Sequence, residues 1–339
     1  MVATGIRVLV VGCGSIGRRH ARVLRQLGVA NLALCDAEPQ AVERARGEIG
    51  GAPGYRSLEE ALDDRFDACF LCTPPALHVP MARLAARRGA DMFVEKPLST
   101  GLAGIDALEE EVRVSNRIAM VGYCFRYHEG LRRVRSMIGA GRIGRLVGVR
   151  AAVGDDLSCA RPGADYRTLY VTAEDVGVTL DMIHEPDFVR WIVGSPPKTV
   201  CAVTGKRSDL EMLGDDMADM LVTFESGVVA NIHLDFFQVR RRRSSEYLGT
   251  EGTITLDMAE WEQAVVSSTR AGEDGWSTEV LLMERDDMFR AMDEEFLRCV
   301  ADRTPPRNSL REGADSLRMA LAARISSRSG RAVSMKEVT

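Results

Sequence analysis

Over residues 1–123, short runs of consecutive apolar residues alternate with amphipathic stretches of helical period. Runs that are apolar at every position are typical of strands buried on both faces of a parallel sheet, and the amphipathic stretches are long enough to be the helices that cover it. The predicted strands are Ile6–Gly12, Asn31–Asp36, Asp67–Thr73, Asp91–Lys96 and Arg117–Phe125, and the predicted helices are Ser15–Leu27, Pro39–Ile49, a short helix capped by Ser57, Ala76–Arg88 and Leu102–Ser115. The pattern therefore predicts a doubly wound α/β domain over residues 1–123.

The pattern changes after Tyr123. Longer segments with alternating apolar and polar residues follow, joined by turn sequences such as "ESG" and "GTEG", which is typical of antiparallel hairpins. The predicted helices of this part are Glu129–Ala140, one continuous helix in "DVGVTLDMIHEPDFVRWIVG", Asp287–Asp302 and Ser309–Ser326. Residues 124–339 are therefore predicted to form an α+β domain with a large, mostly antiparallel open sheet.

The segment "VLVVGCGSIGRRH" contains glycines in the spacing G-x-G-x-x-G. It follows the first predicted strand and opens the first predicted helix, and Asp36 ends the next strand nineteen residues after the last glycine. This context is typical of a dinucleotide-binding Rossmann turn, in which glycines allow a tight turn and the helix N-terminus receives the pyrophosphate. The predicted cofactor-binding residues of the turn are Gly12, Gly14, Ser15, Ile16 and Gly17.

Asp36 also bears on which dinucleotide binds. A carboxylate at this position accepts hydrogen bonds from the ribose 2′-hydroxyl and repels a 2′-phosphate, and no arginine follows it in "CDAEPQ". NAD is therefore favoured over NADP. Further cofactor contacts are predicted at "CTPPALH", where Thr73 and Pro74 follow the third strand at the carboxyl edge of the sheet. For His78 two interpretations are open: it reaches the nicotinamide side, or it caps the next helix.

The fourth apolar run ends in "FVEKP", with a lysine that is unusual for this chain. Lys96 is one of four lysines among 44 basic residues. Only the amine of lysine readily gives up its proton, whereas a guanidinium stays charged. Because Pro97 keeps the preceding residue extended, Lys96 is expected beside Glu95 at the carboxyl edge of the sheet. We interpret Lys96 as a group that takes part in proton transfer; the alternative is a salt bridge between domains, which arginine would serve as well.

Composition excludes several classes of protein. The net charge of −5 and the pI of about 5.7 argue against a nucleic-acid-binding protein, which would be basic. No apolar run approaches the roughly 20 residues of a membrane span, and the N-terminal sequence has no signal-peptide pattern. The eight cysteines show no disulfide framework. We therefore expect a cytoplasmic protein that binds small molecules or copies of itself, and neither nucleic acid nor membranes.

At this point the chain resembles the Gfo/Idh/MocA oxidoreductases, a family that includes glucose–fructose oxidoreductase, inositol dehydrogenases and several sugar ketoreductases. The segments that carry the resemblance are "VGCGSIGRRHARVLRQLG", "CTPPALH", "VEKPLS", "VGYCFRYHEGLR", "GRIGRL", "DVGVTLDMIHEPDFVRWIVG" and "GTEGTITLD". They extend over nearly the whole length. The resemblance implies a dinucleotide-binding domain over residues 1–123, and over residues 124–339 a domain that binds substrate and joins copies of the chain into a homo-oligomer through its sheet.

In that family the lysine of the E-K-P segment, which matches Lys96, is catalytic, and an acid and a histidine that match Asp181 and His184 join it. Many members space the acid and histidine four residues apart, whereas here they are three apart; on one helix both spacings keep the pair on one face. The implied reaction is hydride transfer between a carbinol carbon and nicotinamide, with His184 or Lys96 as the acid/base and Asp181 orienting it. For His184, a buried histidine bonded to a backbone carbonyl is the alternative. Metal-ligand spacing is absent, so no metal is expected.

The irregular stretch Asp155–Asp175 precedes this helix and suits a polyhydroxylated ligand, including one that carries phosphate. The predicted substrate-binding residues are Arg126, Tyr127, Arg161, Tyr166 and Arg167. The alternative for each is a solvated lid or a contact between subunits. The run Arg240–Arg243, at the end of a long strand, is interpreted as a solvated edge or subunit contact and not as part of a site.

Three hypotheses on function follow. The favoured one is an NAD-dependent dehydrogenase or ketoreductase that acts on a secondary alcohol of a sugar, a sugar derivative or a cyclitol. The second is a glycosidase that uses bound NAD transiently. The third is a non-catalytic NAD-binding regulator, against which Lys96, Asp181 and His184 count together.

Overall fold

The computed structural model describes residues 5–159 and 165–339, and these form two compact units. The first unit contains the described residues up to Cys124 together with Asp286–Asp315, and the second contains Phe125–Arg285 and Ser316–Thr339. Residues 286–315, which the sequence assigns to the second domain, thus cluster with the first. The reason is the helix α9 (Asp287–Asp302), which packs against the first helix of the chain.

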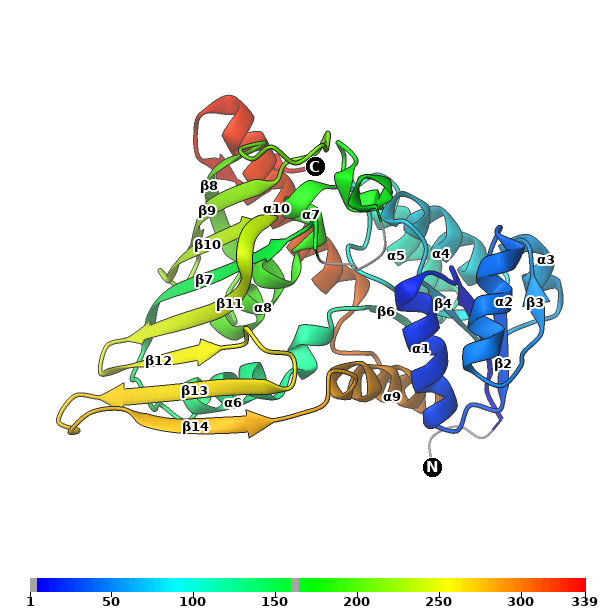
Figure 1. Ribbon diagram of the computed structural model, residues 1–339, viewed down its shortest axis with the longest axis horizontal. Helices are drawn as coiled ribbons and strands as arrows, with labels where there is room; N and C mark the ends of the chain where they lie inside the picture. Colours follow the sequence, from blue (N-terminus) through cyan, green and yellow to red (C-terminus); the bar gives the residue numbers. More distant parts are fainter. Residues whose placement is uncertain (1–4, 160–164) are drawn as a thin grey trace. The chain divides into compact units, whose positions relative to one another are not determined.

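The first unit is built on a six-stranded, fully parallel sheet in the order β3-β2-β1-β4-β5-β6. Figure 1 labels β2, β3, β4 and β6 of this sheet. The strands of the sheet are β1 (Arg7–Val11), β2 (Asn31–Cys35), β3 (Gly54–Tyr55), β4 (Ala68–Leu71), β5 (Asp91–Val94) and β6 (Ala119–Val121). This is the strand order of a doubly wound dinucleotide-binding fold, and it confirms the predicted fold class. The order reverses between β1 and β4, so the chain turns that follow these two strands lie at the switch point.

The helices of the first unit follow the predicted amphipathic stretches closely. They are α1 (Ser15–Gln26), α2 (Pro39–Glu48), α3 (Leu58–Asp63), α4 (His78–Arg87), α5 (Ile105–Val114) and α9. Ser57 caps α3 as expected, because its hydroxyl accepts the backbone N–H of Glu60 at 3.1 Å. The helices pack in two groups, α1 with α2 and α9, and α4 with α3 and α5.

The second unit is built on a nine-stranded sheet in the order β14-β13-β12-β11-β7-β10-β9-β8-β15. The strands are β7 (Leu146–Asp156), β8 (Pro197–Gly205), β9 (Met217–Phe224), β10 (Val229–Asp235), β11 (Phe237–Gly249), β12 (Gly252–Asp257), β13 (Gln263–Arg270), β14 (Ser277–Leu282) and β15 (Val333–Ser334). Only β7 and β10 pair in parallel, so the prediction of a large, mostly antiparallel sheet is confirmed.

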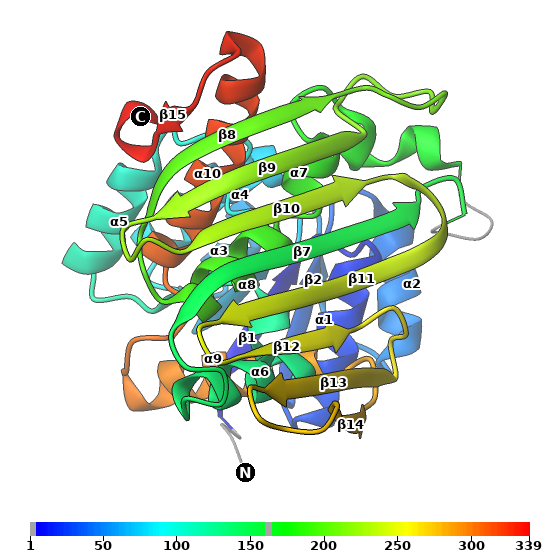
Figure 2. The same cartoon turned by 90° about the vertical axis from the view of Figure 1, so that its left-hand side faces the viewer.

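Helices of the second unit pack on one face of this sheet. They include α6 (Glu129–Gly139) against β12 and β13, α7 (Gly177–Asp181) against β9 and β10, and α8 (His184–Val193) against β7 and β10. Figure 2 shows the other face, over which no described helix lies. The last helix, α10 (Leu310–Ser329), begins in the first unit and ends in the second. Within the described ranges, no helix has the length and apolar character needed to cross a bilayer.

Several predicted elements are broken or end before the predicted residue. The strand predicted over Arg117–Phe125 ends at Val121, and the 3₁₀ helix Cys124–Tyr127 follows it. The helix predicted over "DVGVTLDMIHEPDFVRWIVG" is wrong, because α7 ends at Asp181 and α8 begins at His184. Pro186 explains the break, since its ring has no N–H and would collide with the carbonyl of Met182 four residues earlier. The strand predicted to reach Lys96 ends at Val94, because the N–H of Lys96 donates to the side chain of Glu95 and not to a neighbouring strand.

Candidate functional site

The glycine turn after β1 has the close contacts that make glycine necessary. Gly12 has a φ of +90°, and a Cβ there would lie 2.6 Å from the carbonyl oxygen of Cys72, in the turn after β4. A Cβ on Gly17 would collide with the carbonyl oxygen of Gly12. Both glycines therefore bring the start of α1 tightly against the ends of β1 and β4, as the dinucleotide motif requires.

Gly14 differs from these two, and the difference fits a dinucleotide. A Cβ on Gly14 would meet no described atom within 4 Å. Packing against the described residues therefore does not require a glycine at this position. No described side chain caps α1, and its first turn contains no acidic residue. The N-terminus of α1 thus has open space and backbone N–H groups for an anionic group such as a pyrophosphate.

Asp36 lies beside this turn. One carboxylate oxygen accepts the N–H of Cys13 at 2.7 Å and the other accepts the N–H of Glu38 at 2.9 Å. Each carboxylate oxygen has two lone pairs, so the group can still accept hydrogen bonds from a ribose. The turn and Asp36 together form a frame that fits NAD.

His78 joins two turns at the carboxyl edge of the parallel sheet. Its Nε2 lies 2.8 Å from the carbonyl oxygen of Thr73, and its Nδ1 lies 2.9 Å from that of Pro97. Burial lowers the pKa of His78, against the two carbonyl contacts, which raise it. The side chain does not cap α4, so the helix-cap interpretation is wrong. His78 instead connects the Thr73–Pro74 turn to the turn that contains Lys96.

Glu95 and Lys96 follow β5 at the same edge. The carboxylate of Glu95 accepts the backbone N–H of Lys96 at 3.0 Å through Oε2, and its Oε1 lies 3.0 Å from Nε2 of His20. The other nitrogen of His20 lies 2.9 Å from Asp293 of α9. The residue before the catalytic candidate is therefore held by a buried network that the sequence did not reveal.

In the second unit, Asp181 and His184 lie at the break between two helices. Asp181 is the last residue of α7, and its Oδ1 accepts the hydroxyl of Tyr170 at 2.9 Å. His184 is the first residue of α8 and is 7% exposed, with its ring centroid 4.8 Å from that of Phe125. The two residues are thus placed by the ends of two short helices rather than by one helix face.

Two buried ion pairs fix α8. Arg126 donates from Nε and Nη2 to the two oxygens of Asp187, at 2.8 and 2.6 Å. Arg243 of β11 lies 2.7 Å from Glu185, and its guanidinium stacks 4.2 Å from the ring centroid of Phe125. Burial raises the pKa of Glu185 and Arg243 opposes that rise. The expected substrate residue Arg126 thus has a structural partner in the helix that begins with His184.

The interpretation of the arginine run Arg240–Arg243 as a solvated edge is wrong for its last member, because Arg243 is buried. The alternation of a strand was a usable signal, since four arginines in a row must point to both faces of a sheet. Burial, together with the charges of Arg243 and Arg241, lowers the pKa of the nearby His128 to about 4. This part of the second unit therefore holds a neutral imidazole among fixed positive charges.

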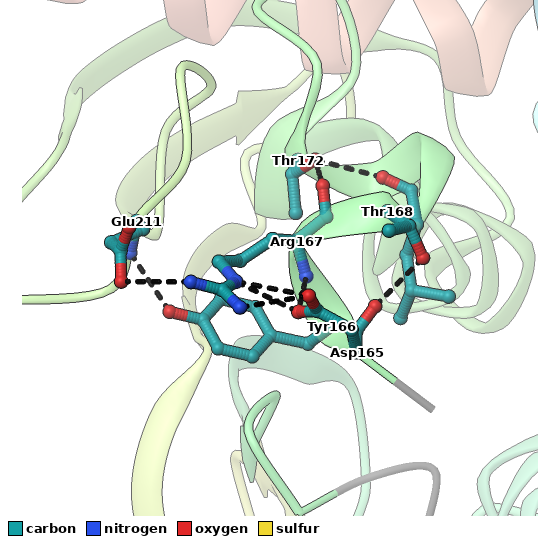
Figure 3. A network of polar contacts seen from close by, with 7 residues as sticks. Asp165, Tyr166, Arg167, Thr168, Thr172 and Glu211 are labelled. Carbon is teal, nitrogen blue, oxygen red and sulfur yellow. Dashed lines mark hydrogen bonds and ion pairs between the residues drawn. The ribbon is translucent and has the colours of Figure 1, made fainter. Parts of the chain in front are cut away.

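The predicted substrate residues Tyr166 and Arg167 face a loop of their own unit (Figure 3). The hydroxyl of Tyr166 accepts the N–H of Glu211 at 3.0 Å. Arg167 donates to the carboxylate of Asp165 at 2.9 Å and lies 3.5 Å from that of Glu211. Tyr127 lies in the short 3₁₀ helix Cys124–Tyr127, next to Arg126. Arg161 lies outside the described residues.

Within the described ranges, no group of three or more His, Cys, Asp or Glu side chains is arranged to hold a metal ion.

Comparison with known proteins identifies the family. Residues 6–123 match the model of the Gfo/Idh/MocA "oxidoreductase family, NAD-binding Rossmann fold", and residues 131–255 match the "GFO/IDH/MocA C-terminal domain". The chain therefore belongs to the Gfo/Idh/MocA family, as its motifs predicted. It is an oxidoreductase with an NAD-binding Rossmann domain, which confirms the predicted enzyme class and cofactor.

Individual relatives extend this result over the full length. The myo-inositol 2-dehydrogenase of Thermotoga maritima is 28% identical over 98% of this chain and 99% of its own. The scyllo-inositol 2-dehydrogenase (NAD(+)) of Bacillus subtilis is 26% identical over 78% of each chain. Among solved structures, a probable dehydrogenase from Thermotoga maritima has a TM-score of 0.82 and 26% identity, covering 98% of this chain and 100% of that one.

Proposed function

We propose that this enzyme removes a hydride from the secondary alcohol of a cyclitol or sugar, with NAD as the acceptor, or catalyses the reverse reduction. The observation that carries the proposal is an open glycine turn after β1 on the same edge of the sheet as Lys96, which follows β5 and whose preceding carboxylate is held by His20. Inositol dehydrogenases among the relatives support a cyclitol or sugar as the substrate.

The proposed cofactor site consists of residues from the first unit. Gly14 and the N-terminus of α1 would receive the pyrophosphate, and Asp36 the adenosine ribose. Other contacts would come from Gly12, Ser15, Ile16, Gly17, Thr73, Pro74, His78, Glu95 and Lys96. NAD supplies the hydride acceptor when it is bound.

The proposed catalytic residues are Lys96, Asp181 and His184. Oxidation of an alcohol needs one side chain to take the hydroxyl proton and another to donate a hydrogen bond to the same oxygen. Lys96 and His184 are the two groups that we propose for these tasks. Asp181, which the hydroxyl of Tyr170 holds at 2.9 Å, orients the base. Tyr127, Arg126, Arg161, Tyr166 and Arg167 remain the proposed substrate contacts.

The uncovered face of the nine-stranded sheet supports a homo-oligomer. Val203, Leu221 and Val229 are 52%, 46% and 41% exposed, and each alternates along its strand with buried residues, so they point away from the buried face of the sheet. We propose that the enzyme works in the cytoplasm as a homo-oligomer assembled through this face. A monomer in analytical ultracentrifugation at micromolar concentration would contradict the assembly.

A substrate panel tests the proposed reaction. The purified chain with NAD⁺ is offered myo-inositol, scyllo-inositol, common aldoses and ketoses, sugar phosphates and nucleotide sugars, and absorbance at 340 nm reports NADH. We expect NADH from at least one cyclitol or sugar. Release of a sugar from a glycoside without net NADH would favour the NAD-dependent glycosidase, and NAD binding without turnover of any compound would favour a regulator.

A further inference from the structure

Three ionisable side chains from distant parts of the sequence meet inside the first unit. His20 comes from α1, Glu95 follows β5, and Asp293 comes from α9. His20 and Asp293 are fully buried, and Glu95 is 5% exposed. The Nδ1 of His20 lies 2.9 Å from both oxygens of Asp293, and its Nε2 lies 3.0 Å from Oε1 of Glu95.

The contacts of His20 require a shared proton. A neutral imidazole has one N–H donor, but here both ring nitrogens face carboxylate oxygens, so both must carry a proton or one carboxyl group must. Burial alone lowers the pKa of His20, yet the carboxylates of Asp293 and Glu95 outweigh burial and raise it to about 10. Complete burial raises the pKa of Asp293, and His20 opposes that rise.

Aromatic rings surround His20. The ring centroids of Phe70, Phe93 and Phe289 lie 5.4, 5.0 and 5.7 Å from that of the imidazole. In such an apolar environment a hydrogen bond between charged groups is stronger than in water, and a missing partner is costly. The network therefore restrains each of its members firmly.

Glu95 transmits this restraint to the next residue. Its Oε1 is held by His20, and its Oε2 accepts the backbone N–H of Lys96 at 3.0 Å. Gly122 leaves room for the carboxylate, because a Cβ at Gly122 would lie 2.8 Å from Oε1 of Glu95. With both oxygens engaged, the carboxylate has one orientation, and the backbone of Lys96 is fixed by it.

We propose that His20 is a positioning residue for Lys96 and acts on it through the carboxylate of Glu95. This inference rests on the proposed catalytic role of Lys96. A purely structural role, in which His20 holds α9 in place, requires only the contact of His20 with Asp293. The contact with Glu95 is the one that ends at Lys96, and it gives the family's E-K-P glutamate a defined task in this chain.

Two variants separate these contacts. In His20→Asn, the amide nitrogen takes the place of Nδ1, so the contact with Asp293 is kept and the contact with Glu95 is lost. In His20→Gln, the longer side chain places its amide nitrogen near Nε2, so the contact with Glu95 is kept. A merely structural role depends on the contact with Asp293, so it predicts that His20→Asn leaves Lys96 undisturbed. Positioning predicts that His20→Asn disturbs Lys96 and that His20→Gln does not.

The first measurement follows the backbone N–H of Lys96 directly. Because the chain has four lysines, ¹⁵N-lysine labelling gives four backbone amide signals, and Lys96→Met identifies that of Lys96 by its loss. We expect the hydrogen exchange of Lys96 to speed up by about tenfold in His20→Asn and by less than about twofold in His20→Gln. The amides of Lys198, Lys206 and Lys336 serve as internal controls. Unchanged exchange at Lys96 in His20→Asn would overturn the inference.

The second measurement is turnover with the best alcohol of the panel. We expect kcat to fall by about 10- to 100-fold in His20→Asn, with KM for NAD⁺ within about twofold, and to recover largely in His20→Gln. Full activity of Lys96→Met would refute the catalytic role of Lys96. Slow Lys96→Met together with wild-type turnover in His20→Asn would refute positioning while leaving the proposed function intact.

Glu95→Gln provides a second route if His20→Asn does not fold. A glutamine has one acceptor oxygen, so it cannot accept from both His20 and the N–H of Lys96. Faster exchange at Lys96 and lower kcat are again expected. If the folded Glu95→Gln variant keeps wild-type exchange at Lys96 and wild-type kcat, Glu95 does not transmit the restraint and the inference is wrong.

Discussion

The two units hold their buried carboxylates in different ways. In the first unit, Glu95 is held by an imidazole and a backbone N–H, and Asp293 by the same imidazole. In the second unit, Glu185 and Asp187 of α8 each have an arginine of their own. A guanidinium stays charged at every relevant pH, whereas an imidazole changes charge near neutrality.

The same contrast appears in two buried histidines. His20 lies between two carboxylates, and its pKa is raised to about 10. Burial and two nearby arginines lower the pKa of His128 to about 4. Neighbouring charges thus decide whether a buried histidine is an imidazolium or a neutral ring. In the first unit, a histidine holds the carboxylate next to Lys96. In the second unit, two arginines, which stay charged, hold the helix that begins with His184.

The largest effect on stability is expected where a fixed charge loses its partner. Asp187→Leu leaves the guanidinium of Arg126 buried without its carboxylate, and we expect the free energy of unfolding to fall by about 3–5 kcal/mol. Urea denaturation followed by circular dichroism measures the change. In the double variant Arg126→Met/Asp187→Leu no charge is left unpaired, so most of the loss should be recovered. A double variant as unstable as the single one would show that the ion pair is not the cause.

A carboxylate that accepts backbone N–H groups should matter for ligand binding. Asp36 accepts two backbone N–H groups and can still accept from a ribose. We expect Asp36→Ala to weaken NAD binding by about 10- to 100-fold and to reduce discrimination against NADP. Isothermal titration with both dinucleotides measures this. An unchanged preference would show that Asp36 does not contact the ribose.

The two histidines should give stability opposite dependences on pH. The contribution of His20 is fully present below its unfolded pKa of 6.5 and is lost as the pH rises through about 10. The contribution of His128, which folds as a neutral ring, is present above 6.5 and is lost as the pH falls through about 4. His20→Gln should therefore flatten the alkaline limb of stability, and His128→Gln the acid limb.

Imidazole ¹⁵N shifts give a direct check, because the chain has only five histidines. At pH 8 the ring of His20 should be doubly protonated, and at pH 5.5 that of His128 should still be neutral. The same charge on both rings at either pH would remove the contrast.

The smallest effect is expected at Tyr170. Its hydroxyl is a neutral donor to Asp181, in contrast to the arginines that hold Glu185 and Asp187. Tyr170→Phe should lower kcat by about threefold to tenfold and leave NAD binding unchanged. Steady-state kinetics would measure it, and a kcat equal to that of the wild type would mean that Asp181 needs no orientation by Tyr170.

Local sequence patterns predicted most elements of the first unit. The apolar runs, the glycine turn and the cap at Ser57 act over a few residues, so helix and strand ends were found within a few positions. The grouping of α9 with the first unit was not predictable in this way, because it depends on a contact between His20 and Asp293 across 273 residues of sequence.

For the candidate site, the sequence contained signals for local features of the backbone but none for the distant partners of its side chains. Pro186 marked the break between α7 and α8, and the alternation of a strand marked an inward arginine in the run that ends with Arg243. The partners of these residues were not marked, because a side chain does not reveal in sequence which distant group it meets. Lys96 was identified by its type and position, whereas the network behind it became visible only in three dimensions.

The central claim is that Lys96 serves the chemical step and adds little to the affinity for NAD. The most direct measurement compares Lys96→Met with the wild type in rapid-mixing formation of NADH, with NAD bound beforehand and the best alcohol of the panel added. We expect NAD affinity within about twofold of the wild type and a rate lower by about 10²- to 10⁴-fold. A variant that forms NADH at nearly the wild-type rate would contradict the account.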